Sequence, residues 1–277
     1  MYRKVFIDEY LKHGFDLEEA KAEVNFACEI LFNYKYKDFI LDKKLEKRQI
    51  NGLKKIISER IQTHRPISQI IGQSFFYGRR FFVNEHTLIP RSETEILVSK
   101  VLELAKEFHN PKILEIGTGS GCIALTLILE NPDTEVHAID ISEYALETAK
   151  KNAILHNISS NINFFKSDIY ENVTDKYNII VSNPPYIPLK DKETLQIEVR
   201  DFEPALALFA GDEAGIEFYK KIIDKAANYL HNGGYIALEH GINQAGKISN
   251  LLKEQKFSWI KQIKDFNNIE RIILSKK

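Results

Sequence analysis

The sequence has 277 residues, of which 44% are hydrophobic and 28% are charged, with 13 glycines and 8 prolines. At roughly 100–200 residues per domain this length suggests two domains, and the composition excludes a disordered or fibrous chain. The 38 Lys and Arg side chains against 39 Asp and Glu leave a net charge of -1. That balance disfavours a protein that binds nucleic acid through a broadly basic surface.

The N-terminal residues MYRKVFIDEYLKHGF lack the apolar core and the cleavage site of a signal peptide, and no run of about 18 apolar residues follows. We therefore expect a cytoplasmic protein with no membrane association. The two cysteines, Cys28 and Cys122, have no CxxC spacing, and the eight histidines are scattered. This pattern predicts free thiols and no metal site.

Residues 1–71 form the first predicted domain. Apolar residues recur there three or four positions apart, as at Ala20, Val24, Ala27 and Ile30, which is typical of amphipathic helices. The pattern predicts a bundle of about four helices, the last of which ends near residue 64. The expected breaks between helices lie near residues 13–16, 33–37 and 41–44.

The pattern changes at Phe75. The segment FFYGRRFFV alternates aromatic and polar residues around Gly78, and this alternation predicts a short β-hairpin. We assign residues 72–88 to a linker that contains it.

In residues 89–277 apolar strands alternate with amphipathic helices, which predicts an α/β fold with a mostly parallel sheet wound on both faces. The stretch between Pro188 and Gly215 has no clear periodicity and predicts a loop over a site. Asn232-Gly233-Gly234 predicts a turn into the strand YIALEH.

A glycine-rich segment, Glu115-Ile-Gly117-Thr-Gly119-Ser-Gly121, stands between a predicted strand and a predicted helix. Glycines let the backbone turn sharply and approach a ligand closely. A dinucleotide fingerprint has Gly or Ala three residues after its second glycine, where this chain has Cys122, and this disfavours NAD. The spacing fits the loop with which class I methyltransferases surround the methionine part of S-adenosylmethionine. A tight turn without a ligand remains the alternative.

Two aspartates follow the next strands. Asp140 ends the strand EVHAID, where a carboxylate can accept hydrogen bonds from both hydroxyls of a ribose. Such a residue indicates a nucleoside and fits NAD and S-adenosylmethionine equally; a charge at a helix N-terminus near Ser142 is the alternative. Asp168 could receive an adenine amino group and Ile169 could cover the adenine face. A surface aspartate at a strand end is the alternative for Asp168.

The segment Asn183-Pro184-Pro185-Tyr186 directly follows the apolar strand YNIIVS. Two consecutive prolines make its backbone stiff and extended. The Asn183 side-chain carbonyl and the Pro184 backbone carbonyl together suit a planar NH₂ group, against which Tyr186 could stack. A rigid turn without a function is the alternative.

These segments closely resemble the release-factor glutamine methyltransferases over almost the whole chain. That family methylates the amide nitrogen of the glutamine in the Gly-Gly-Gln motif of peptide chain release factors. The chain departs from the family at Ser92, which replaces a proline, at Ile70, which replaces a tyrosine, and at Glu115, which replaces an aspartate. The resemblance rests further on PRSETE from Pro90 to Glu95, SQIIG from Ser68 to Gly72, FYG from Phe76 to Gly78, FEP from Phe202 to Pro204, Glu239-His240-Gly241 with Gln244, and Asp265 with Arg271.

The resemblance implies a class I, Rossmann-like methyltransferase domain, residues 89–277, behind an N-terminal helical domain, residues 1–71, that binds the release factor. It implies S-adenosylmethionine as the cofactor, S-adenosylhomocysteine as its product, and no metal. The implied cofactor-binding residues are Glu115, Gly117, Thr118, Gly119, Ser120, Gly121, Asp140, Asp168, Ile169 and Asn183. The implied substrate-binding residues are Asn183, Pro184, Pro185, Tyr186 and Arg91, with Asn183, Pro184 and Tyr186 as the catalytic ones.

Arg91 has an alternative interpretation, shared with Glu93, as part of a capped helix start with Ser92 as the N-cap and Glu95 three residues on. The role of Glu239 is open.

Two other functions compete with release-factor methylation. An enzyme that methylates the amino group of adenine or guanine in nucleic acid would also need a site for a planar NH₂ group. The near-neutral charge and the absence of a tract rich in Arg and Lys disfavour it. A non-catalytic binding protein with the same fold is disfavoured by the intact segment from Asn183 to Tyr186. We expect release factors as partners, no direct nucleic-acid binding and a monomer.

Overall fold

The computed structural model describes residues 2–41, 43–158 and 160–277. Contacts within the chain divide it into two compact units. We call the first, Met1–Gln73 with Ile197–Phe202, the helical unit, and the second, Ser74–Gln196 with Glu203–Lys277, the sheet unit. Nothing in the sequence pattern indicates that residues 197–202 group with the N-terminal helices.

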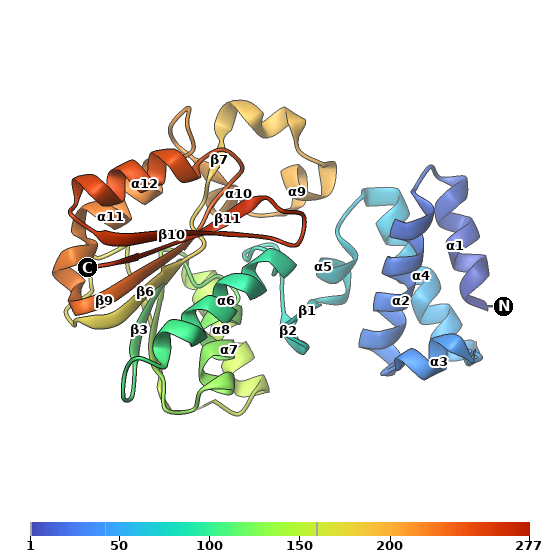
Figure 1. Ribbon diagram of the computed structural model, residues 1–277. Helices are drawn as coiled ribbons and strands as arrows, with labels where there is room; N and C mark the ends of the chain where they lie inside the picture. The colour runs from blue at the N-terminus through green and yellow to red at the C-terminus, as the bar shows by residue number, and fades with distance from the viewer. Residues whose placement is uncertain (1, 42, 159) are drawn as a thin grey trace. The chain divides into compact units, whose positions relative to one another are not determined.

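Among its described residues, the helical unit contains the four expected helices and two more (Figure 1). Its core includes Tyr10, Val24, Leu53 and Ile57, all of which are buried. Asp16 caps one helix, because its side chain accepts a 2.8 Å hydrogen bond from the backbone N–H of Glu18. The helices are α1 (Tyr2–Lys12), α2 (Leu17–Phe32), α3 (Tyr36–Ile40), α4 (Lys47–Thr63), α5 (Ile67–Ile71) and α9 (Ile197–Phe202).

A buried ion cluster joins three of these helices. The Arg60 side chain on α4 is 1% exposed, and its guanidinium lies 2.9 Å from carboxylate oxygens of Glu19 and Glu23 on α2 and of Glu198 on α9. The same guanidinium lies over the ring of Phe15 at 4.7 Å from its centroid. Burial raises the pKa of Glu23, and the charge and hydrogen bonds of Arg60 act against that rise. Arg60 therefore fixes α9 within the helical unit.

The predicted hairpin is confirmed as strands β1 (Gln73–Phe76) and β2 (Arg79–Phe82). Its turn needs left-handed backbone at Tyr77 and Gly78, with φ of 51° and 71°. Asn152 anchors the second strand in the sheet unit. Its Oδ1 accepts from Phe82 N at 2.6 Å, and its Nδ2 donates to Phe82 O at 3.0 Å.

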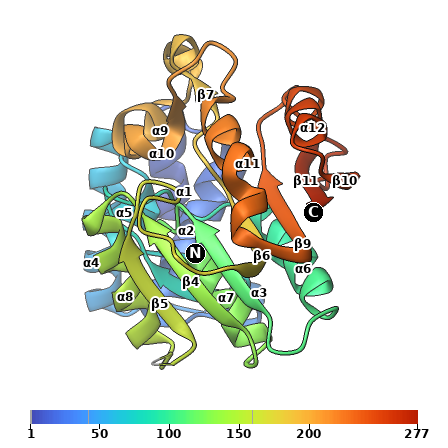
Figure 2. The same ribbon diagram turned by 90° about the vertical axis from the view of Figure 1, so that its left-hand side faces the viewer.

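The sheet unit is built on a seven-stranded sheet in the order β10-β11-β9-β6-β3-β4-β5. The strands from β9 to β5 are parallel, and β11 runs antiparallel to β9 and β10. Figure 2 shows β5, β4, β6 and β9 in this order across the sheet, and β3 lies between β4 and β6. The strand bounds are β3 (Lys112–Ile116), β4 (Glu135–Asp140), β5 (Ile162–Lys166), β6 (Tyr177–Ser182), β9 (Leu230–Glu239), β10 (Ser258–Lys264) and β11 (Glu270–Lys276).

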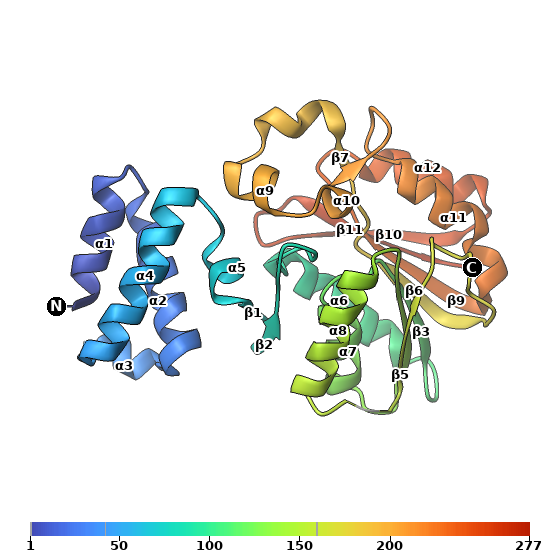
Figure 3. The ribbon, with the colours of Figure 1, turned by 180° about the vertical axis from the view of Figure 1, so that it is seen from behind.

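Helices cover both faces of the sheet, as predicted. On one face α6 (Ser92–Ala105), α7 (Cys122–Glu130) and α8 (Glu143–Leu155) share a core with Ile113, Val136 and Ile179 (Figure 3). On the other face α11 (Glu217–Tyr229) and α12 (Ala245–Glu254) pack on Leu114 and Ile180. Neighbouring residues of one strand thus enter opposite cores, which explains why these strands are apolar throughout.

The structure corrects two expectations about connections, although Pro204, Leu206 and Ala207 of the first stretch do line a cavity, as expected of a segment over a site. The stretch from Pro188 to Gly215 contains short elements and is not a plain loop: η1 (Leu189–Thr194), α9, α10 (Ala205–Leu208) and the strand β8 (Phe209–Ala210), which pairs with β7 (Ile187–Pro188). Asn232-Gly233-Gly234 lies within β9 as an irregularity in its pairing with β6, with φ of 77° at Gly233.

Within the described ranges of the chain, no helix has both the length and the apolar character needed to cross a membrane. Cys28 and Cys122 are both buried and free, as predicted.

Candidate active site

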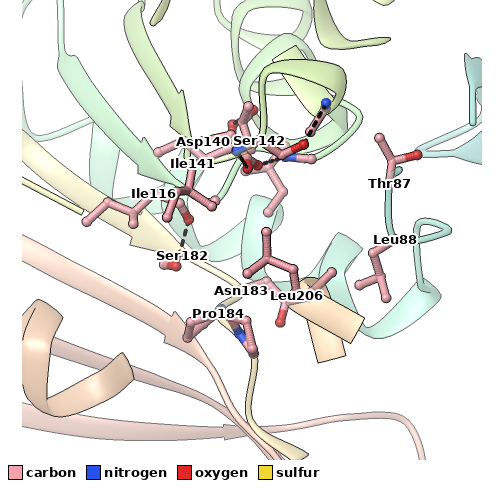
Figure 4. Close-up of a pocket in the computed structure, with 18 of the residues that line it drawn as sticks. Thr87, Leu88, Ile116, Asp140, Ile141, Ser142, Ser182, Asn183, Pro184 and Leu206 are labelled. Carbon is pink, nitrogen blue, oxygen red and sulfur yellow. Dashed lines mark hydrogen bonds between the residues drawn. The ribbon is translucent and has the colours of Figure 1, made fainter. Parts of the chain in front are cut away.

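A cavity of about 480 Å³ lies at the carboxyl ends of the parallel strands of the sheet unit (Figure 4). This is the edge at which open α/β sheets bind ligands, and the volume is within the range of about 300–1,000 Å³ for small-molecule sites. The residues that follow the strands and line the cavity are Ile116 to Ser120 after β3, Asp140 to Ser142 after β4, Ser167 to Ile169 after β5, and Asn183 to Pro185 after β6. The topology thus brings the glycine loop, the two aspartates and the segment at Asn183 together at one edge of the sheet.

The glycine loop between β3 and α7 uses its glycines for two different reasons. Gly117, Gly119 and Gly121 all have positive φ, at 76°, 55° and 79°. A Cβ added at Gly117 or Gly119 would meet nothing within 4 Å, whereas one at Gly121 would lie 3.1 Å from the Cβ of Ala149 on α8. The first two glycines therefore serve the turn beside the cavity, and the third also allows α7 to pack closely against α8.

Glu115 presents a buried carboxyl group to this cavity. Its Oε2 accepts from Thr118 Oγ1 at 2.6 Å and from Ala124 N at 3.1 Å, and its Oε1 has no partner within the described part of the chain. Burial raises the pKa of Glu115 to about 8. A buried acceptor without a partner beside a small-molecule cavity fits a cationic ligand group, such as the ammonium or sulfonium of S-adenosylmethionine.

Asp140, at the end of β4, holds the glycine loop through a hydrogen bond to its backbone at Gly119. Its two carboxylate oxygens accept from Gly119 N at 2.8 Å and from Ser142 N at 2.9 Å. Burial raises the pKa of Asp140, and these backbone hydrogen bonds lower it in part. Because each carboxylate oxygen has a second lone pair, the group can still accept from ribose hydroxyls.

Asp168 and Ile169 both line the cavity at the end of β5. Ile169 has a φ of 51°, which is a strained value for a β-branched residue. The Ser167 hydroxyl steadies this backbone by donating to Ile169 O at 3.1 Å. Strain of this kind collects at functional sites, and Ile169 lines the cavity here.

Replacing Asp140 with asparagine is expected to weaken cofactor binding about 10- to 100-fold. The change removes charged hydrogen bonds, worth about 1.5–3 kcal/mol each, and places an NH₂ group opposite a backbone N–H donor. Calorimetric titration with S-adenosylhomocysteine measures the effect. Glu143→Gln, on the exposed start of α8, is the control, and an unchanged Kd for the Asp140 variant would contradict the assignment.

The segment after β6 enters the cavity with three of its four residues, Asn183, Pro184 and Pro185. The Ser182 hydroxyl fixes its start by donating to Ile116 O on β3 at 2.7 Å (Figure 4). Tyr186 is not among the cavity-lining residues. Its backbone carbonyl accepts from Gln244 Nε2 at 2.8 Å, and burial raises the pKa of its phenol to about 12.

Arg91 lines the cavity and pairs with the buried carboxyl group of Glu203, which also accepts from Ile89 N at 3.3 Å. The alternative of a helix start capped by Ser92 was wrong. Arg91 is the N-cap of α6 and makes no side-chain cap. Glu95 accepts from Tyr77 N at 2.7 Å and does not close a capping box.

The sequence does not indicate two parts of the cavity wall. One is the segment after the hairpin, which includes Thr87 and Leu88 (Figure 4), and the other comes from α11. The apolar residues among them match ordinary core patterns, so only the fold identifies them as parts of the wall. The wall residues of α10 belong to the stretch from Pro188 to Gly215, which was expected to lie over a site. The wall residues from α10 and α11 are Leu206, Ala207, Phe218, Lys221 and Ile222. In the described part of the chain, no group of three or more His, Cys, Asp and Glu side chains is placed to hold a metal ion.

Comparison with known proteins agrees with this geometry. A family model for the methyltransferase small domain matches residues 92–205. The release factor glutamine methyltransferase of Fusobacterium nucleatum is 37% identical over 97% of this chain and 76% of its own length. The enzyme of that name from Francisella tularensis is 42% identical over 83% of this chain and 81% of its own.

Two solved structures share the fold. A methyltransferase from Pyrococcus furiosus has a TM-score of 0.51 at 22% identity and covers 82% of this chain and 98% of its own. The hMettl16 catalytic domain in complex with MAT2A 3'UTR hairpin 6 has a TM-score of 0.55 at 16% identity, covering 83% and 82%.

The fold and the cavity thus define a class I, Rossmann-like methyltransferase that depends on S-adenosylmethionine. Solved structures at such low identity show the fold alone, whereas the curated relatives match the chain over most of its length. The chain belongs to the release factor glutamine methyltransferase family.

Proposed function

We propose that the protein methylates the side-chain amide nitrogen of the glutamine in the Gly-Gly-Gln motif of peptide chain release factors. One observation carries this proposal: Asn183 and Pro184 line the same cavity as the glycine loop and Asp140, in a chain of this family. S-adenosylmethionine, when bound, supplies a methyl group activated by a sulfonium. The residues proposed to hold it are Glu115, Gly117, Thr118, Gly119, Ser120, Gly121, Asp140, Asp168, Ile169 and Asn183.

The chemical difficulty lies in the substrate. An amide nitrogen is a poor nucleophile because its lone pair is delocalised into the carbonyl group. We propose that the Asn183 side-chain carbonyl and the Pro184 backbone carbonyl accept the two N–H hydrogens of the glutamine amide and so fix its plane. Positive charge grows on the nitrogen as it accepts the methyl group, and both hydrogen bonds then strengthen.

This arrangement needs no general base at the moment of attack. Methyl transfer first gives an amide whose nitrogen is positively charged and still carries both hydrogens. This cation is strongly acidic, and water or a nearby carboxylate can accept the proton that it loses. Positioning supplies the remaining rate enhancement. Pro185 stiffens the segment, and we assign Tyr186 and Arg91 to substrate binding.

The helical unit is the proposed surface for capturing the release factor. A substrate that presents one glutamine on a loop gains affinity from contacts elsewhere, and residues 1–71 are the candidate for these contacts. We expect the protein to act in the cytoplasm as a monomer, without a metal.

The test is methyl transfer from labelled S-adenosylmethionine to a purified release factor. A release factor with its motif glutamine changed to alanine, total RNA and DNA are run in parallel. Label on the release factor that disappears with its glutamine is the expected result. Label on nucleic acid alone would replace the proposal with amino-group methylation of a base, and cofactor binding without transfer to any substrate would indicate a binding protein.

A further inference from the structure

Glu239 ends β9 beside the segment that carries Asn183, and the cavity does not include it. In the parallel pairing of β6 with β9, Ser182 lies opposite Leu238, so Asn183 and Glu239 are the next residues on neighbouring strands. Glu239 is 2% exposed. A carboxyl group buried this deeply is costly unless other groups bind it.

The side chains of Thr94 on α6 and of Asn183 neighbour this carboxyl group and lower its pKa against the effect of burial. Asn183 Nδ2 also donates to Thr94 Oγ1 at 3.3 Å. The second carboxylate oxygen of Glu239, Oε2, has no partner within the described residues. The three side chains therefore form a small polar cluster at the cavity wall, in which Thr94 and Asn183 line the cavity and Glu239 does not.

The chemistry of these groups fixes the direction of every hydrogen bond. An ionised carboxylate only accepts, so both Thr94 and Asn183 must donate to it. Thr94 then uses its single O–H on Glu239 and accepts from Asn183 through its oxygen. Asn183 must turn its NH₂ end toward the cluster, which leaves its Oδ1 for the cavity.

We propose that Glu239 is a positioning residue whose buried carboxylate holds the NH₂ of the Asn183 carboxamide and so presents Oδ1 to the substrate amide. The inference rests on the proposed function, in which Asn183 Oδ1 accepts a hydrogen from that amide. A reversed carboxamide would place an NH₂ opposite the NH₂ of the substrate and could not accept its hydrogens. Glu239 therefore determines which end of the Asn183 carboxamide faces the substrate amide.

The proposal implies a dependence on pH. Burial raises the pKa of Glu239 to about 7, with Glu93 adding to the rise and Thr94, Arg271 and Asn183 acting against it. A protonated Glu239 can donate to Asn183 Oδ1 and stabilise the reversed carboxamide. The competent form is the carboxylate, so kcat is expected to fall as the pH drops through about 7.

Burial moves the pKa of four other groups near Glu239 away from neutral pH. Tyr219, on α11, donates to Glu239 O, and burial raises the pKa of its phenol well above its usual value. Burial likewise raises the pKa of Cys122 to about 12 and that of Tyr186 to about 12, whereas it lowers the pKa of His240.

The test compares the full-length protein with Glu239→Gln, which keeps the size of the side chain and removes its charge. We expect kcat for release-factor methylation to fall about 10- to 100-fold, the effect that loss of an orienting partner has on a metal ligand. The binding of S-adenosylhomocysteine should stay unchanged, and the fall in kcat below about pH 7 should disappear. Glu239→Asp, which keeps the charge, should retain the pH dependence. Glu135→Gln, at the amino end of β4, is the matched control.

A second measurement does not depend on methyl transfer. The side-chain NH₂ signal of Asn183 in ¹⁵N-labelled protein, assigned by its absence in Asn183→Ala, should shift with pH near 7 in the wild type and stay constant in Glu239→Gln. A constant wild-type signal, or a Glu239→Gln enzyme with a kcat within twofold of wild type and an unchanged pH profile, would overturn the proposal. If the release factor is not methylated at all, the proposed function fails, and the NMR titration alone decides whether Glu239 orients Asn183.

Discussion

Replacing Asn183 with alanine is expected to lower kcat for release-factor methylation about 10²–10³-fold, the usual effect of removing one preorganised hydrogen-bonding group at a transition state. The loss should appear in kcat, because this hydrogen bond strengthens only as positive charge develops on the amide nitrogen. Steady-state kinetics with labelled S-adenosylmethionine and purified release factor measure it.

The matched control for this variant is Asn232→Ala, an exposed asparagine on β9 outside the cavity. Its kcat should equal that of the wild type. An Asn183→Ala enzyme within tenfold of wild-type activity would refute the role that we propose for the Asn183 carbonyl.

Replacing Arg60 with methionine is expected to destabilise the helical unit by about 3–5 kcal/mol, because it leaves the carboxylates of Glu23, Glu19 and Glu198 without their buried cation. The size of the deficit should depend on pH. Burial already raises the pKa of Glu23 above its ordinary value, and without Arg60 it should rise further. A carboxyl group whose pKa is raised in the folded state stabilises that state when protonated, so the deficit should shrink as the pH falls through the raised pKa toward about 4.5.

Hydrogen exchange of the α2 and α4 amides at pH 5 and pH 8 measures this effect on the full chain. Arg65→Met, at a half-exposed arginine of the same unit, is the control and should change stability little. Equal protection of wild type and Arg60→Met at pH 8 would contradict the structural role of the cluster.

The main architecture of the sheet unit could be predicted because its causes are local in the sequence. Strands buried on both faces are apolar throughout, amphipathic helices alternate with them, and the glycine loop carries its own backbone requirements. These features suffice to place the segments around Gly117, Asp140 and Asn183 at one edge of the sheet.

The parts that could not be predicted depend on contacts between distant residues. The helix α9 has six residues, too few to be stable alone, and its ion pair joins Glu198 to Arg60, 138 positions away. Likewise, Arg91 is extended and not helical, with φ of -106° and ψ of 148°. Its ion pair with Glu203 holds it there, so α6 begins at Ser92 as its first helical residue.

The place of α9 has a practical consequence for dissecting the protein. The chain passes from one unit to the other after Gln73, again after Gln196 and a third time after Phe202. The two units are therefore not separate, continuous stretches of the sequence. A truncation that starts at Ser74 would retain α9 and leave Glu198 without its buried cation. Exchanging the helical unit between family members therefore requires a two-segment graft that carries residues 197–202 together with the N-terminal helices.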